Sequence, residues 1–147
     1  MERLAQLARE RCEAAGARLG KSLALLGESR SRLTLLERYR DEYRGRFASA
    51  GSQGITRDGL RNFREFLARL EQAIAQQRAE VAVLERGTED ARALWLAARR
   101  REQSFDILFD RAQIESRAIE ARQLQKMLDE HSGRAAADAS ARPSPLR

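Results

Sequence analysis

The chain has 147 residues and a net charge of +6; 34% of its residues are charged and only 5% are aromatic. This composition, rich in Ala, Leu, Glu, Arg and Gln, is typical of long helices and coiled coils, and it argues against a globular core around a catalytic pocket. The single cysteine, the lack of a signal peptide and the lack of a run of about 18 apolar residues lead us to expect a cytoplasmic protein that neither carries internal disulfides nor spans a membrane.

A first helix is predicted for residues 2–48, where seam residues recur in alternating steps of three and four. Its inward frame comprises Ala5, Ala8, Cys12, Ala15, Leu19, Ser22, Leu26, Ser29, Leu33, Leu36, Arg40, Tyr43 and Phe47. Many of these side chains are small. Gly16, Gly20 and Gly27 lie outside the frame, and each costs roughly 1 kcal/mol of helix stability relative to Ala. We therefore expect this helix to be the less stable of the two.

A turn is predicted for residues 49–56, because three glycines interrupt both periodic segments in the stretch ASAGSQGITRDG, residues 48–59. Thr56 is the expected N-cap of the next helix. Asp58 follows in the first turn, where a negative charge favours the helix dipole.

A second helix is predicted for residues 57–130. Its frame comprises Leu60, Phe63, Leu67, Leu70, Ile74, Gln77, Val81, Leu84, Thr88, Ala91, Trp95, Ala98, Glu102, Phe105, Phe109, Ala112, Ser116, Ile119, Gln123 and Lys126. Fourteen of these twenty residues are apolar. The mean spacing of 3.5 residues predicts a left-handed coiled coil.

The two frames predict an all-α fold in which residues 1–132 form one long antiparallel two-helix coiled coil. Both prolines lie in the last five residues, so no proline interrupts either helix. A parallel dimer formed through the second helix is the alternative. The short turn favours a monomeric hairpin, because it holds the two frames at a high effective concentration. Residues 133–147 are small, polar and proline-containing, and we expect them to be disordered.

The expected pairing of the helices follows from a turn centred near Ser52. Residues whose numbers sum to about 104 then face each other, which brings Ala8 near Trp95 and Leu33 near Leu70. The first helix would run out opposite residues 99–102, because the helices span roughly 70 and 110 Å at about 1.5 Å per residue. The second helix is thus expected to overhang the first.

No catalytic, metal or cofactor site is expected, because two helices form no pocket that excludes water. His131 has no partner ligands, Cys12 lies in the inward frame, and no phosphate-binding GxxxxGK[ST] loop is present. The sequence pI of about 10.6 raises nucleic-acid binding as a possibility. Acidic residues are interleaved with the basic ones, however, and residues 99–101 are the only run of three.

Tyr39 and Phe66 lie at the flank of their frames and face each other by the same pairing. The residues expected around them are Arg32, Leu36, Tyr43, Leu70 and Ala73. One interpretation is that these aromatics widen the seam between the helices. The other is that they form a docking strip for a partner, since exposed apolar patches mark interaction sites and Tyr and Arg are favoured there.

The overhang is a second candidate surface. Its apolar residues are Phe105, Leu108, Phe109, Ala112 and Ile119. Burying one large apolar side chain is worth about 1.5 to 3 kcal/mol, so we expect another molecule to cover them. Because the sequence begins at Met1, we expect no upstream extension of the first helix to do so.

Several stretches resemble the FliJ family of bacterial flagellar export proteins. They are LLERYRDEYRGRF (35–47), the following GIT, NFREFLARLEQAIAQQ (62–77), Trp95 in the long second helix and the charged end RQLQKMLDEHSGR. The resemblance extends from about Leu4 to Arg134. It is most specific over residues 36–77, and elsewhere it is that of a generic coiled coil.

The resemblance implies a non-enzymatic protein without cofactors, shaped like the central stalk of rotary ATPases. It implies binding to the flagellar export ATPase hexamer, to the membrane export gate and to export chaperones, in the cytoplasm at the inner membrane of the flagellar base. The gate-contacting strip would comprise Arg32, Leu36, Tyr39, Tyr43, Phe66, Leu70, Ala73 and Gln77. The ATPase-contacting residues would be Leu4, Leu7, Arg99, Arg100, Phe105, Leu108, Phe109, Ile119 and Met127.

The free protein is expected to be a monomer that binds no nucleic acid. Two other functions stay open on the residues alone. One is a scaffolding coiled coil with no ATPase partner. The other is a basic coiled coil that binds nucleic acid.

Overall fold

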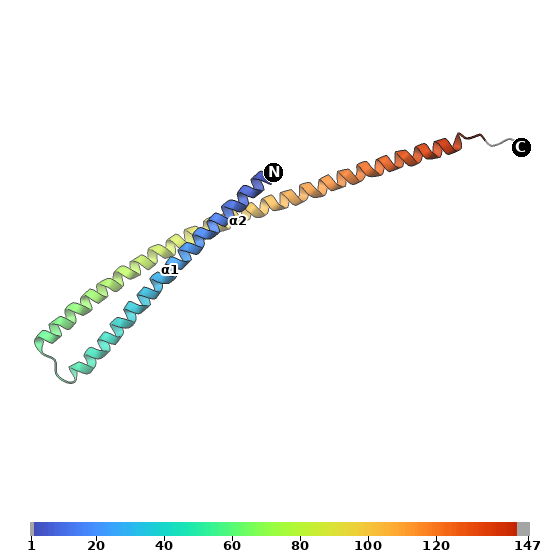
Figure 1. Ribbon diagram of the computed structural model, residues 1–147. Helices are drawn as coiled ribbons and strands as arrows, with labels where there is room; N and C mark the ends of the chain where they lie inside the picture. The colour runs from blue at the N-terminus through green and yellow to red at the C-terminus, as the bar shows by residue number, and fades with distance from the viewer. Residues whose placement is uncertain (1, 144–147) are drawn as a thin grey trace.

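The computed structural model describes residues 2–143, which form two long α-helices joined by a short connection. Helix α1 spans Glu2–Gly51 and helix α2 spans Arg57–Ser140. Figure 1 shows α1 folded back along α2, and α2 continuing well past the beginning of α1. The predicted all-α antiparallel hairpin with an overhanging second helix is therefore confirmed, and the described residues contain no strand.

The seam between the helices consists of the two predicted frames. Every frame residue of α1 from Ala5 to Phe47 is buried or half-buried, and so is every frame residue of α2 from Leu60 to Phe109. The most enclosed apolar side chains are Ala8, Leu26, Leu70, Ile74 and Val81. The core is thus a single line of side chains rather than a globular interior, as the hydrophobic period indicates.

Polar groups within the seam are satisfied. The Gln77 side-chain amide donates hydrogen bonds to the Ser29 backbone carbonyl at 3.1 Å and to the Ser29 hydroxyl at 2.8 Å. The Thr88 hydroxyl donates to the Leu84 carbonyl at 2.8 Å. A buried polar group without a partner would cost about 1 to 3 kcal/mol, so these bonds make polar seam residues tolerable.

The connection between the helices is held by local hydrogen bonds. The Gln53 backbone N–H donates to the Ala50 carbonyl at 3.0 Å. Gly54 has a φ of 87°, a backbone conformation that residues other than glycine rarely adopt. The Thr56 hydroxyl accepts from the Gly59 N–H at 3.1 Å, which confirms the predicted N-cap of α2.

The pairing of the helices differs from the expected one. Trp95 lies on Gly16, where an added Cβ would be 3.4 Å from the indole Nε1, and not on Ala8 as predicted. The error arises because α1 continues to Gly51, which moves the centre of the turn from Ser52 towards Gly54. Trp95 therefore contacts α1 eight residues farther along than expected.

The shifted pairing also changes what the overhang contains. Phe105 and Phe109 are half-buried against α1, and Phe109 lines an open hollow together with Ala5 and Arg9. The prediction that α1 runs out opposite residues 99–102 is thus wrong. The overhang begins after Phe109, and all residues from Arg111 to Ser140 are exposed.

Helix α2 ends at Ser140, about ten residues later than the predicted end at Glu130. Residues 133–140 are helical, whereas we expected disorder there. The segment is rich in alanine, the strongest helix former, which offsets the cost of Gly133. Pro143 follows shortly after the end and disfavours continuation. Residues 144–147 of the predicted tail, Pro145 among them, lie outside the described residues.

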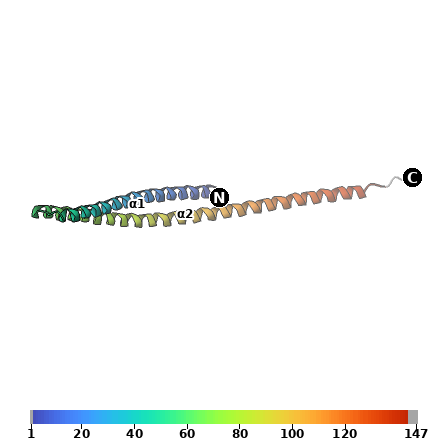
Figure 2. The same ribbon diagram turned by 90° about the horizontal axis from the view of Figure 1, so that it is seen from below.

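The helices wind around each other. Near the turn they lie side by side in Figure 1 and overlap in Figure 2, whereas towards the beginning of α1 they cross in Figure 1 and separate in Figure 2. The molecule is therefore a slender twisted rod. Within residues 2–143 neither helix contains an 18-residue stretch apolar enough to cross a membrane.

Candidate partner-binding surfaces

An aromatic cluster lies at the turn end of the rod. The rings of Phe47 and Phe63 stack with centroids 3.6 Å apart, and Tyr43 stacks on Phe63 at 5.0 Å. Phe66 packs against Tyr43 at 4.5 Å and meets Tyr39 edge-on at 6.3 Å. Each helix supplies rings from its seam and its flank, so the cluster clamps the two helices together near the turn.

Tyr39 and Phe66 are the outer members of this cluster. Tyr39 is 49% exposed and Phe66 is 37% exposed. The sequence correctly places the two rings against each other on one edge. Because both rings are supported from below by seam aromatics, they are held in place while presenting apolar surface to solvent. This geometry suits a docking surface.

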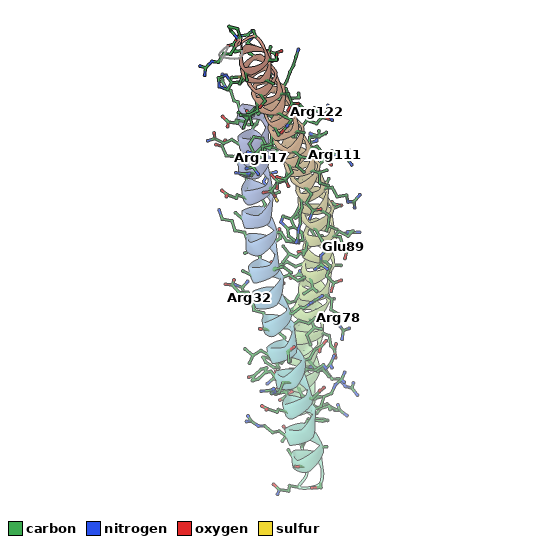
Figure 3. The ribbon with its side chains drawn as sticks, turned by 90° about the vertical axis from the view of Figure 1, so that its right-hand side faces the viewer. Arg32, Arg78, Glu89, Arg111, Arg117 and Arg122 are labelled. Carbon is green, nitrogen blue, oxygen red and sulfur yellow. The ribbon has the colours of Figure 1, made fainter. Side chains whose placement is uncertain are left out.

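The other residues predicted for this strip have different environments. Leu36, Tyr43 and Ala73 are half-buried at its base, and Arg32 is exposed and paired with Glu28 at 3.8 Å. Figure 3 shows Arg32 projecting from α1. Leu70 and Gln77 belong to the seam. Leu70 is only 7% exposed, and the Gln77 amide is engaged by Ser29, so neither offers much surface to a partner.

Leu35 was missed by the sequence reasoning. It is highly exposed and, with Leu36, Tyr39, Arg38 and Glu42, lines a shallow groove of about 430 Å³ beside the strip. Its position four residues before Tyr39 places it on the same flank of α1, and that spacing was available as a signal.

The open end of the rod carries the residues predicted to contact an ATPase. Leu4, Leu7 and Leu108 are exposed, as expected for a contact surface. Arg99 and Arg100 are exposed too, and Arg99 lies over the Trp95 ring at 5.3 Å from its centroid. Phe105 and Phe109 are the exceptions, because α1 covers them in part. They stabilise the open end of the hairpin and leave less surface for a partner than expected.

The overhang exposes apolar residues around a single unpaired helix. The predicted residues Ile119 and Met127 are exposed, and so are Ile114, Leu124 and Leu128, which the sequence reasoning missed. In this part of α2 several positions of the seam frame are polar, namely Ser116, Gln123 and Lys126. Figure 3 shows Arg111, Arg117 and Arg122 projecting from α2 here.

A second apolar stripe takes over in the overhang. The stripe starts at Ile107, just before the overhang, and continues through Ile114, Ala121 and Leu128 at seven-residue intervals. Each of these residues comes two positions before a residue of the seam frame or its continuation. Two positions correspond to about 200° around an α-helix, so this stripe faces nearly the opposite way from the seam. A partner that covers it approaches from a different side than α1 does.

The two sides of the hairpin are chemically different. On one side, residues that come directly after a seam residue in the sequence form ion pairs between the two helices. These are Arg9 with Asp106 at 3.2 Å, Arg30 with Glu85 at 2.9 Å, Glu37 with Arg78 at 2.9 Å and Arg44 with Glu71 at 2.6 Å. We call this the ion-pair flank. The opposite side, formed by residues that precede the seam positions, has no interhelical ion pair within residues 2–143, and we call it the apolar flank.

Arg40 shows how a charge is accommodated in the seam. Its side chain bridges Asp41 at 3.1 Å and Glu71 at 3.7 Å. The hydrogen bond to Asp41, together with the neighbouring carboxylates, raises the pKa of the guanidinium further. The stem packs in the seam while the charged head reaches the ion-pair flank.

Reactive groups are sparse. The Cys12 thiol, half-buried in the seam, has a raised pKa because it is hydrogen-bonded to Glu102, because it is partly desolvated and because the Glu102 charge disfavours the thiolate. His131 is exposed. No cluster of three or more potential metal ligands occurs within residues 2–143.

Comparisons with known proteins agree over nearly the whole chain. A family model described as "Flagellar FliJ protein" matches residues 1–141. The chain is 31% identical over 133 residues to the "Flagellar FliJ protein" of Escherichia coli strain K12, covering 90% of each chain. It is 29% identical over 136 residues to the "Flagellar FliJ protein" of Salmonella typhi, covering 92% of each chain. No solved structure matches.

Proposed function

The chain belongs to the family of flagellar FliJ proteins, and we propose that it is a non-enzymatic coupling factor of the flagellar type III protein export apparatus. The observation that carries the proposal is the difference between the two ends of one rod. The turn end presents a supported aromatic strip, and the open end presents a bare helix. A rod with distinct binding surfaces at its ends can link the states of two partners.

The turn end binds the membrane export gate in this proposal. Tyr39 and Phe66 make the primary contact, because they are the cluster's exposed rings and need little reordering on binding. Leu35 extends the contact along the adjacent groove. Leu70 and Gln77 act indirectly, by holding the two helices in register beneath the strip.

The open end and the overhang bind the export ATPase ring. Leu4, Leu7 and Leu108 supply apolar contacts beside the basic pair Arg99 and Arg100. The overhang is a helix of about 30 residues, or roughly 45 Å, which is long enough to enter a ring while the hairpin stays outside or at its rim. Its stripe through Ile114 and Leu128 is the main apolar contact.

Export chaperones are the third partner class in this proposal. The family resemblance supports them. Attachment at the inner membrane follows, in this proposal, from binding to the gate. Mechanical continuity supports coupling, since α2 is one uninterrupted helix of 84 residues.

The experiment adds the full-length chain to the purified export ATPase. We expect it to promote ring assembly, seen by electron microscopy, and to raise the rate of ATP turnover. Unchanged assembly and turnover would support a scaffolding coiled coil instead. Binding to DNA at physiological ionic strength, weakened steeply by added salt, would support the nucleic-acid alternative.

A further inference from the structure

The apolar flank contains an open groove midway along the rod, between the aromatic strip and the overhang, and none of its lining residues belongs to either proposed partner surface. It has a volume of about 770 Å³. Small residues form its floor, with Ala14 and Ala15 from α1 and Gly87 and Ala91 from α2. Two exposed leucines flank it, one from each helix: Leu25 is 53% exposed and Leu94 is 59% exposed.

The groove continues towards the open end. A neighbouring hollow of about 240 Å³ shares Arg11 and Leu94 with it and adds Ala8, Ala97 and Ala98. The combined surface runs along α1 from Ala8 to Leu25, a length of roughly 25 Å at about 1.5 Å per residue. A surface of this length and shape, with a floor of small residues between two helices, accepts a third helix at close distance.

The rim of the groove is basic. Arg11, Arg18 and Lys21 from α1 and Arg101 from α2 line it, against a single acidic residue, Asp90. None of these four cations forms a salt bridge within residues 2–143, whereas the ion-pair flank matches most of its charges across the seam. The rim thus has unmatched positive charge beside an apolar floor.

We propose that this groove binds an amphipathic helix of a partner protein whose apolar face is flanked by acidic residues. Charge complementarity selects this occupant, because glutamates on either side of the apolar face would meet Arg11, Arg18, Lys21 and Arg101. A second copy packed groove to groove would oppose two basic rims. Nucleic acid would leave Leu25, Leu94 and the alanine floor without an apolar partner.

This inference goes beyond the proposed function, since the groove lies between the gate strip and the overhang and its test needs no export component. The probe is a synthetic helical peptide of about 20 residues, a length set by the groove at about 1.5 Å per residue, with Leu and Ala on one face and Glu at its borders. A second peptide has the same apolar face and Lys at its borders. Each carries a fluorophore, and binding to the full-length chain is followed by fluorescence anisotropy.

We expect the Glu peptide to bind at least about tenfold more tightly than the Lys peptide, and added salt to narrow that difference. The double variant Leu25→Asp with Leu94→Asp should abolish binding. Its matched control is Leu23→Asp with Leu96→Asp, which changes two exposed leucines at equivalent places on the ion-pair flank and should preserve binding. Circular dichroism verifies that all variants stay helical.

Three results would overturn the proposal. They are no binding of the Glu peptide, equal binding of both peptides, and equal loss in the two double variants. Analytical ultracentrifugation supplies a further check. Self-association of the unmodified chain that disappears in the Leu25→Asp and Leu94→Asp variant would assign the groove to a second copy and contradict an acidic partner helix.

Discussion

Gln77 of α2 reaches across the seam and donates hydrogen bonds to both the carbonyl and the hydroxyl of Ser29 on α1. Ser29 is only 2% exposed, so water does not readily replace Gln77 as its partner. A polar pair at a seam position ties one residue of α1 to one residue of α2. Polar seam residues are known to specify the register of coiled coils at some cost in stability.

Replacing Gln77 by Ala should lower the free energy of unfolding by about 1 to 3 kcal/mol, because the Ser29 hydroxyl loses its partner in a buried place. Urea unfolding followed by circular dichroism measures the change. Gln76→Ala, one residue away and exposed, is the control and should change stability by less than about 0.5 kcal/mol. Equal effects of the two variants would show that the pair contributes nothing.

Leu70→Asp should destabilise the hairpin by several kcal/mol, since it places a charge at a seam position with 7% exposure. The melting temperature, followed by circular dichroism, should fall sharply. The neighbouring Arg69→Asp lies on the surface and should leave it nearly unchanged. If Leu70→Asp melts at the temperature of the unmodified chain, the seam does not hold the hairpin together.

Replacing Tyr39 and Phe66 together by Ala should weaken binding to the export gate and reduce motility while leaving helicity nearly intact. Both rings are substantially exposed, and their edge-on pairing is worth only about 0.5 to 1.5 kcal/mol. Calorimetry with the purified gate domain measures the affinity. A large loss of helical circular dichroism would instead support the interpretation that these aromatics belong to the seam.

Changing Ile114 and Leu128 to Asp should weaken assembly of the ATPase ring without altering the unfolding of the hairpin, because the overhang packs on nothing within residues 2–143. Ser116→Asp with Gln123→Asp adds the same charge on the opposite face and is the matched control. Ring assembly by electron microscopy and ATP turnover are the readouts. If both double variants lost ring assembly and ATP turnover to the same extent, the stripe would not be the face that contacts the ATPase.

Cys12 should react slowly with iodoacetamide at pH 8.5, because the hydrogen bond to Glu102 keeps the thiol protonated. Glu102→Gln should lower the pKa of this thiol and speed alkylation. The folded chain holds the Cys12 proton more tightly than the unfolded chain does. The contribution of this thiol to the free energy of unfolding is therefore fully present below pH 9.0, the pKa of the free thiol, and is lost as the pH rises through the higher pKa of the folded state. An unchanged alkylation rate in the variant would exclude this role of Glu102.

The sequence by itself determined which face of each helix is buried. A period of 3.5 residues leaves one face apolar, and that face is hidden wherever two helices pack, as at Leu26 and Ile74. It also determined the beginning of α2, since Thr56 and Asp58 act through local hydrogen bonding and the helix dipole. The contact between Tyr39 and Phe66 followed from the same reasoning, because each residue directly precedes a seam position and both therefore lie on the same flank.

Only the tertiary structure decided which residues of α1 face which residues of α2. A heptad pattern is nearly unchanged when one helix slides by seven residues along the other, so the period alone does not place Trp95 on Gly16. The length of the connection and specific pairs such as Ser29 with Gln77 select the register. That choice covered Phe105 and Phe109, and it brought opposite charges together on one flank while leaving the other flank apolar with a basic rim.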